Sequence, residues 1–264
     1  MFGGFASTSN NSGTDWGEQM LNTVASNTIR HLFTRSESVE VSVRCYPSSK
    51  LLQGSIDNFK MNGRGLVIRR DFRAEEMTFE TDAVSLDFSS VLKGQIRLKQ
   101  PTQAIAQVVL TEADINNSFT AELVRKRLEN LSIPALSELS GGEPISFTDV
   151  QVKLQPNNRL QLFAKVNLRD RGLVPISMTS TLAVERRRQI IFKDSKFESD
   201  TIPESCREIS QTLTTALDEI LNTMVDLDRF NLDGVTMRIN RLETQGKRLI
   251  FSGYAQIERI PNNP

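Results

Sequence analysis

Segments with alternating apolar and polar residues are grouped between helical segments, and this grouping constrains the fold more than any other feature. Every second residue is apolar from Val39 to Cys45 and from Leu160 to Leu168, and nearly so from Val174 to Val184. Such alternation is typical of strands with one buried face. Residues 235–254 read as the two arms of a hairpin. The order helix, strands, helix, strands, helix, hairpin predicts antiparallel sheets and an α+β fold.

Three segments have the three- and four-residue spacing of amphipathic helices. The first runs from about residue 14 to 33. The second opens at Thr111, where Thr111 and Asp114 fit a capping box, and continues to Leu128. The third begins near Pro203. The apolar stripe of this third helix includes Ile209, Leu213, Leu217 and Leu221.

The chain reads as one folded unit with a short tail. Residues 1–13 are rich in Gly, Ser, Thr and Asn, a composition typical of disorder. Residues 14–264 then form a single α+β domain. Within it, residues 132–144 contain Pro, Gly and Ser in the density expected of a loop, and we expect that loop to be mobile.

An eight-residue cassette occurs twice, forty positions apart. Residues 49–56 (SKLLQGSI) align with residues 89–96 (SSVLKGQI), with Ser, Leu, Gly and Ile in register. A repeat of this kind indicates one supersecondary unit used twice. We expect a short turn between strands, with Gly54 and Gly94 as hinges that curve a sheet. Leu52 and Leu92 would then plug the edge of that sheet or line its opening.

Composition and charge exclude several classes of protein. The 264 residues are 38% hydrophobic and 24% charged, with 32 basic and 32 acidic residues. A formal net charge of zero argues against a nucleic-acid partner, because phosphate binding needs a surplus of positive charge. No apolar run approaches the roughly 20 residues that span a bilayer, and no signal peptide is seen. We therefore expect a cytoplasmic protein, with peripheral contact to a membrane as a further option.

Residues for catalysis or metal binding are scarce. His31 is the only histidine, and the two cysteines, Cys45 and Cys206, are too far apart for a metal-binding motif. Two cysteines in a chain of this length are read as thiols in a reducing compartment. The sequence has no nucleophile elbow of the form G-x-S-x-G. The expectation is a protein that is not an enzyme and needs no metal or cofactor.

Several motifs, in their order along the chain, resemble the LmeA-type phospholipid-binding proteins of bacteria. They are Cys45-Tyr46-Pro47-Ser48 with the first cassette, Asn62-Gly63-Arg64-Gly65-Leu66, the second cassette, Leu110-Thr111-Glu112-Ala113-Asp114-Ile115-Asn116, Phe230-Asn231-Leu232-Asp233-Gly234-Val235, and Gly253-Tyr254-Ala255 running on to Ile260-Pro261. The resemblance implies a tubular lipid-binding architecture, in which a long curved antiparallel sheet wraps around amphipathic helices. It also implies binding of phospholipid. Members with an envelope role carry an export signal, which this chain does not show.

The leading hypothesis is that a phospholipid or other acyl-chain lipid binds in an apolar groove between sheet and helix, for lipid transfer or membrane-lipid homeostasis. The residues predicted to contact lipid are Leu52, Leu92, Met178, Ile209, Leu213, Leu217 and Leu221. Arg186, Arg187 and Arg188 are candidates for contact with head groups or a membrane, although the tip of a hairpin is the favoured explanation for such a run. The alternative is a scaffold with a filled core, whose N-terminal helix binds a protein partner or a membrane surface. Helical periodicity does not separate the two, since both need an apolar face.

Overall fold

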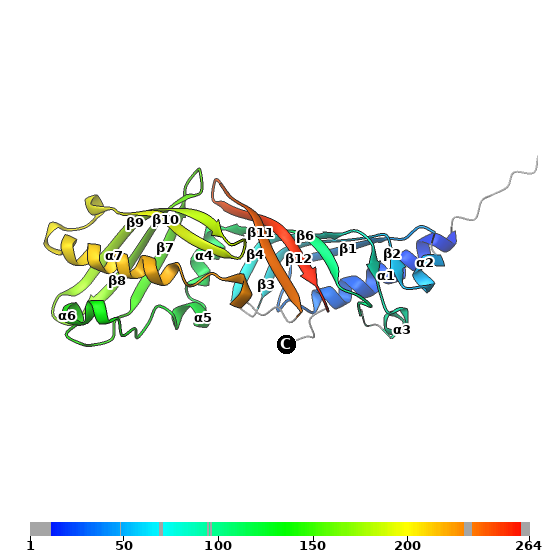
Figure 1. Cartoon of the computed structure of the whole chain (residues 1–264), viewed down its shortest axis with the longest axis horizontal. Helices are drawn as coiled ribbons and strands as arrows, with labels where there is room; N and C mark the ends of the chain where they lie inside the picture. Colours follow the sequence, from blue (N-terminus) through cyan, green and yellow to red (C-terminus); the bar gives the residue numbers. More distant parts are fainter. Residues whose placement is uncertain are drawn as a thin grey trace, which may run out of the picture.

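The strands form two large antiparallel sheets that lie end to end in an elongated molecule (Figure 1). The computed structural model describes residues 12–47, 49–68, 71–93, 95, 97–229 and 234–259. The six-stranded sheet has the order β1 (Ser38–Arg44), β3 (Asn58–Ile68), β4 (Phe72–Thr81), β6 (Thr102–Thr111), β12 (Arg248–Ile257) and β11 (Val235–Gln245). The four-stranded sheet has the order β10 (Gln189–Phe197), β9 (Gly172–Glu185), β8 (Arg159–Leu168) and β7 (Phe147–Leu154). The two-residue strands β2 (Ser55–Ile56) and β5 (Val84–Ser85) pair separately. The predicted α+β class with antiparallel sheets is confirmed.

Two long helices accompany the two sheets. They are α1 (Ser12–Arg30) and α7 (Arg207–Leu221). The shorter α-helices are α2 (Ser49–Leu52), α3 (Phe88–Val91), α4 (Glu112–Ser118), α5 (Glu122–Arg125) and α6 (Ser137–Ser140), and the 3₁₀ turns are η1 (Pro134–Leu136), η2 (Ser199–Thr201), η3 (Glu204–Cys206) and η4 (Leu227–Arg229). Helix α7 packs against β9 and β10, and α1 packs against β1. Each sheet therefore has its own long helix.

The four-stranded sheet follows directly from the alternation in its sequence. In β8 the side chains of Leu160, Leu162, Ala164, Val166 and Leu168 are all buried. They share a face with β9 residues, because Leu162 pairs with Met178 and Ala164 pairs with Ile176. The stripe of α7 joins this face in one hydrophobic core.

A second core lies between α1 and the β1–β3 edge of the six-stranded sheet. Leu21, Ala25 and Ile29 of the helix are buried at the four-residue spacing of one helical face. They pack in one cluster with the alternating Val39, Val41 and Val43 of β1. Helix α1 begins at Ser12, so residues 12 and 13 are helical and not part of a tail. The rest of the predicted tail lies outside the described residues.

The segment between the two sheets forms several short helices where the sequence predicts one long helix and a loop. The capping box is confirmed, because Thr111 Oγ1 accepts from the Asp114 amide and the Asp114 carboxylate accepts from the Thr111 amide. The single helix predicted from Thr111 to Leu128 is wrong, since α4 ends at Ser118 and only the four residues of α5 follow. The predicted loop at 132–144 contains η1 and α6, and it anchors Leu136, which is 2% exposed.

The two sheets are joined by the β11–β12 hairpin, which crosses between them (Figure 1). Asn158, in the β7–β8 turn, has its backbone amide bonded to Thr244 Oγ1 of β11 and its side-chain oxygen bonded to the Thr244 amide. Leu242, Leu249 and Phe251 of the hairpin belong to the core of the four-stranded sheet. The hairpin is therefore shared between both ends of the molecule.

The two cassettes form short helical turns at the end of the molecule farthest from α7 (Figure 1). The first turn is α2 and the second is α3. They are held together by the β2–β5 pairing and by the Leu86 amide, which donates to Gly54 O at 2.5 Å. Gly54 has φ +78°, and a Cβ there would lie 2.0 Å from Leu86 O. Gly54 thus allows the two turns to approach each other, while Gly94 lies outside the described residues.

Candidate functional site

The residues predicted on the α7 stripe are brought together with Met178, all in one place. Leu213, Leu217 and Met178 are each 0% exposed, while Ile209 and Leu221 are 8% and 2% exposed. All five belong to the core between α7 and the four-stranded sheet, where their neighbours are protein side chains. A lipid would reach them only if α7 moved away from the sheet. Their contact with lipid stays a prediction, and the structure places them in packing.

Leu52 and Leu92 lie at the opposite end, far from α7. Their side chains are 72% and 65% exposed. Leu52 ends α2, and Leu92 is the C-cap of α3. The expectation that they plug a sheet edge is wrong, because the neighbouring Leu51 takes the buried position of the turn at 6% exposure. The first cassette therefore points Leu51 inward and Leu52 into solvent.

The three arginines at 186–188 lie in the turn between β9 and β10. Arg188 Nη1 donates to Asp228 Oδ2 at 2.5 Å, and its carbonyl accepts from the Leu227 amide. The Arg187 guanidinium bonds to Asn240, and its carbonyl accepts from the Ile239 amide at 2.6 Å. These two arginines tie the hairpin tip to η4 and β11. Arg186 and Arg187 are exposed and Arg188 is half-buried, so contact of these arginines with head groups stays a prediction.

A different apolar surface lies in the middle of the six-stranded sheet. Along β6, Ala104, Ala106 and Val108 pair with Thr81, Phe79 and Met77 of β4 on one side. On the other side the same three residues pair with Ala255, Gly253 and Phe251 of β12. Residues opposite each other in antiparallel strands share a face. We call this surface the central apolar face and define it as Met77, Phe79, Ala104, Ala106, Val108, Met237, Phe251, Gly253, Ala255 and Ile257.

Small residues form the floor of the central apolar face, and large ones flank them. Ala104, Ala106 and Ala255 are at most 3% exposed. The large side chains of Met77, Phe79, Met237, Phe251 and Ile257 are only half-buried. Met77 and Phe79 border the α1 core, and Phe251 borders the α7 core. The face therefore connects the two cores across a strip where large apolar side chains remain partly exposed.

Gly253 shows how tightly this strip is built. A Cβ at Gly253 would lie 1.8 Å from Arg238 O of the neighbouring strand β11. The register of β11 and β12 shifts at this point, between Ile239 and Arg241. Such a bulge bends a strand and increases its twist. Glycine is thus required at 253, and it leaves a further position of the floor without a side chain.

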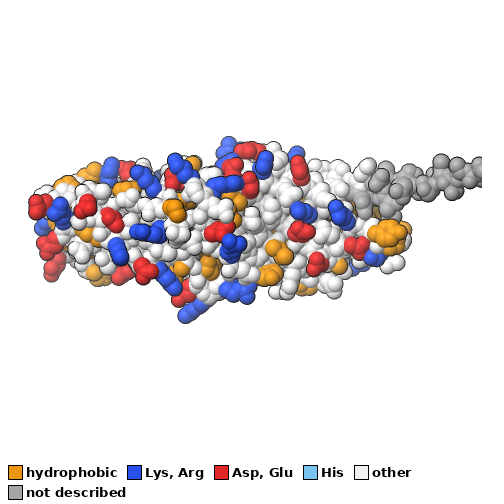
Figure 2. Space-filling model, turned by 90° about the horizontal axis from the view of Figure 1, so that it is seen from above, with side chains coloured by type: hydrophobic (Ala, Val, Ile, Leu, Met, Phe, Trp, Pro, Cys, Tyr) orange, Lys and Arg blue, Asp and Glu red, His pale blue; other side chains and the backbone are white. Residues whose placement is uncertain are grey.

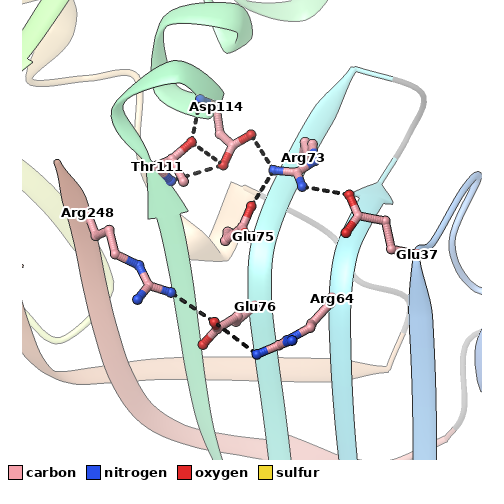
Figure 3. A network of polar contacts seen from close by, with 8 residues as sticks. All are labelled: Glu37, Arg64, Arg73, Glu75, Glu76, Thr111, Asp114 and Arg248. Atoms are coloured by element: carbon pink, nitrogen blue, oxygen red, sulfur yellow. Dashed lines mark hydrogen bonds and ion pairs between the residues drawn. The ribbon is translucent and has the colours of Figure 1, made fainter.

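The opposite face of the same sheet carries ion pairs, together with the exposed side chains of Ile105 and Tyr254. Lys60 pairs with Glu80 at 3.5 Å. Glu76 Oε1 contacts Arg64 at 3.9 Å and Arg248 at 2.9 Å (Figure 3). The two faces of the six-stranded sheet therefore differ, since one is apolar and the other combines ion pairs with two exposed apolar side chains.

A second group of ionic contacts anchors the far end of β4 to α4. Arg73 donates to Glu37, Glu75 and Asp114 at 2.9, 2.7 and 2.9 Å (Figure 3). Glu37 first, then Glu75 and Asp114, raise the pKa of Arg73 above its already high ordinary value. The Asp114 carboxylate is only 4% exposed and also closes the capping box with Thr111. This cluster holds the start of α4 to the sheet.

The residues singled out for chemistry are scattered. Cys45 is buried, and its thiol donates to Ser55 O at 3.2 Å. Cys206 is half-buried at the start of α7, and His31 lies just beyond the end of α1. In the ranges that the structure describes, no group of three or more His, Cys, Asp or Glu residues is placed to hold a metal ion.

Sequence reasoning missed the central apolar face, although a signal was present. Ala104, Ala106 and Val108 alternate with Gln103, Ile105 and Gln107, of which two are polar. That alternation predicts a strand with one apolar face, but it does not indicate that small residues from β6 and β12 meet. Cross-strand pairing brings them together, and the pairing partner of β6 is more than a hundred residues away in the chain.

Comparison with known proteins gives one result. A family model described as LmeA-like phospholipid-binding matches residues 13–253, nearly the whole chain. No curated protein matches the sequence. Among the described residues, none of the helices is both long enough and apolar enough to cross a membrane.

Proposed function

Because the chain belongs to the LmeA-like phospholipid-binding family, we propose that it holds the acyl chains of a phospholipid against the central apolar face. The observation that carries this proposal is the strip of small residues, Ala104, Ala106, Gly253 and Ala255, between large apolar side chains that are only half-buried. Large apolar side chains are normally covered by close packing in a protein interior. Here an apolar ligand would cover the exposed parts of the large side chains that flank the strip.

The chemistry of the face suits an acyl chain. The alanines of the floor are already covered, so an acyl chain would lie against the half-buried side chains of Met77, Phe79, Met237 and Phe251. Each buried methylene contributes about 0.8 kcal/mol, so several methylenes of one chain are enough for stable binding. Methionine adapts its shape to irregular partners, which favours tolerance of different chain lengths. Burial of this kind has no direction, so we expect loose selectivity for the acyl chain.

The protein would act by holding a lipid and not by changing it. The central apolar face has no nucleophile or titratable side chain among its members. The head group would stay in water at the border of the sheet. Transfer of phospholipid between membranes, or maintenance of membrane lipid composition, is the role that follows from reversible binding.

A matched pair of variants on one edge strand tests the proposal. Met237→Glu places a charge on the central apolar face, where Met237 is half-buried. Thr236→Glu places the same charge on the exposed opposite face of the same strand. The probe is phosphatidylglycerol with a pyrene-labelled acyl chain, added below the concentration at which it aggregates. We expect wild type and Thr236→Glu to bind it and Met237→Glu to lose binding at least tenfold.

Two results would contradict the proposal. One is equal binding by Met237→Glu and Thr236→Glu, with both variants folded by circular dichroism. The other is the absence of phospholipid in organic extracts and native mass spectra of protein purified from its own host, together with no binding of the pyrene probe by wild type.

A further inference from the structure

The end of the molecule formed by the two cassette turns exposes large apolar side chains. Tyr46, Leu52 and Leu92 are 81%, 72% and 65% exposed, which makes them the most exposed large apolar residues in the described part of the chain. Tyr46 precedes the first turn, Leu52 ends it, and Leu92 caps the second. Figure 2 shows hydrophobic side chains gathered at this end of the elongated surface. Exposed apolar side chains that gather in one patch, unlike single scattered ones, mark a site of interaction.

The repeat makes the exposure of the leucines systematic. Leu52 and Leu92 occupy the same position of the cassette, and each ends or caps a helical turn of four residues. In the first copy, Leu51 is buried beside it at 6% exposure. The segments that carry the two turns are joined by the β2–β5 pairing and by Lys99 Nζ, which donates to Gln53 O at 3.1 Å. The same exposed leucine is therefore presented twice at this end of the molecule.

Basic residues are frequent in the two segments that carry the exposed apolar side chains. Segments 44–56 and 88–100 contain five basic residues and no acidic ones, although the whole chain has no net charge. The five are Arg44, Lys50, Lys93, Arg97 and Lys99. All except Lys50, which is partly buried, have exposed side chains. The nearest acidic residues are engaged locally: Asp57 with Lys50 at 2.7 Å, and Asp87 with the hydroxyls of Ser89 and Ser90 at 2.7 Å each.

We propose that the two cassette turns form a docking tip that inserts Tyr46, Leu52 and Leu92 into the surface of a bilayer containing anionic phospholipid. Apolar and aromatic side chains ringed by Lys and Arg are suited to the interface of such a membrane. A neutral or acidic rim would fit a soluble protein partner equally, whereas the local positive charge favours lipid phosphates. This inference rests on the proposed function, since the tip would bring the central apolar face to the membrane from which a phospholipid is taken.

Flotation with lipid vesicles tests the tip. The full chain is mixed with vesicles of equal parts phosphatidylcholine and phosphatidylglycerol, and with vesicles of phosphatidylcholine alone. We expect the wild type to float with the anionic vesicles and to dissociate as salt screens the charges. The double variant Leu52→Ser/Leu92→Ser should reduce the apparent partition coefficient at least tenfold. Removing one rim charge, as in Lys93→Gln, should reduce it about fivefold, the fold-change that corresponds to the contribution of one basic residue near an anionic surface.

An exposed leucine from the other end of the molecule provides the matched control. Leu173 is 57% exposed at the start of β9, on the sheet that carries α7. Leu173→Ser should float as well as wild type. Equal losses in Leu173→Ser and in Leu52→Ser/Leu92→Ser would overturn the docking tip, as would a wild type that never floats with anionic vesicles.

The two proposals fail separately. Leu52→Ser/Leu92→Ser should still bind the monomeric pyrene-labelled phosphatidylglycerol, because its central apolar face is intact. Met237→Glu should still float with anionic vesicles while losing the monomeric probe. A tip variant that loses the monomeric probe and keeps flotation would contradict the assignment of both surfaces.

Discussion

Truncation of Leu213 in α7 distinguishes a packed core from a lipid-lined channel. The Leu213 side chain is 0% exposed and lies in the core that α7 shares with the four-stranded sheet. Leu213→Ala removes three carbon groups, which corresponds to about 2.4 kcal/mol of lost burial. A residual cavity adds to this loss, so we expect the free energy of unfolding to fall by roughly 3–4 kcal/mol.

The assay is denaturant unfolding of the delipidated protein, followed by far-ultraviolet circular dichroism. The midpoint should fall while the dependence on denaturant concentration stays the same, as expected when stability alone changes. Leu173→Ala, at a side chain that is 57% exposed, should change the free energy of unfolding by less than about 0.5 kcal/mol. A loss below about 1 kcal/mol for Leu213→Ala in lipid-free protein, against the 2–5 kcal/mol usual for core leucines, would refute direct packing of α7 on the sheet.

Three further substitutions test separate parts of the structure. Gly253→Ala places a Cβ 1.8 Å from Arg238 O. The free energy of unfolding should therefore fall by about 1–3 kcal/mol, and amide hydrogen exchange should accelerate in β11. Arg73→Gln leaves the Asp114 carboxylate, 4% exposed, without its cation; we expect a loss of about 1–3 kcal/mol by denaturant unfolding, and an unchanged midpoint would argue against the cluster in Figure 3. Hydrogen bonds from Arg188 and then Arg238 lower the pKa of Asp228 in the folded protein. The ionised carboxylate therefore stabilises the fold fully at any pH above the ordinary aspartate pKa of about 4. This stabilisation is lost as the pH falls through the lowered pKa of the folded state. Asp228→Asn should therefore have a lower free energy of unfolding than wild type at neutral pH, and the difference should vanish in acid. A difference that grew in acid would contradict the lowered pKa of Asp228.

Apolar periodicity predicted the helices and strands well where a single face of the element is buried. The stripe of α7 and the alternation in β8 were both visible, because each of these elements has one face toward the core and a more exposed opposite face. The capping box at Thr111 was found because it depends on residues three positions apart. The end of α4 at Ser118 was missed, since the apolar spacing continues through Phe119 to Leu128 even though the backbone does not.

Long-range pairing accounts for what the sequence could not predict. The strands divide between two sheets, and the β11–β12 hairpin returns from the end of the chain to pair with β6. That return creates the central apolar face from residues more than a hundred positions apart. Likewise, Leu51 and Leu52 are equivalent in sequence, and only the three-dimensional turn determines that the first is 6% and the second 72% exposed.

The most direct test of the account is to map where a bound phospholipid lies. A phosphatidylglycerol with a photoactivatable diazirine on its acyl chain is bound to the protein, irradiated, and located by peptide mass spectrometry. The account predicts adducts on the central apolar face, above all at Met77, Phe79, Met237 and Phe251. Adducts concentrated on α7, at Leu213 and Leu217, would contradict it and would mean that the lipid lies between α7 and the four-stranded sheet.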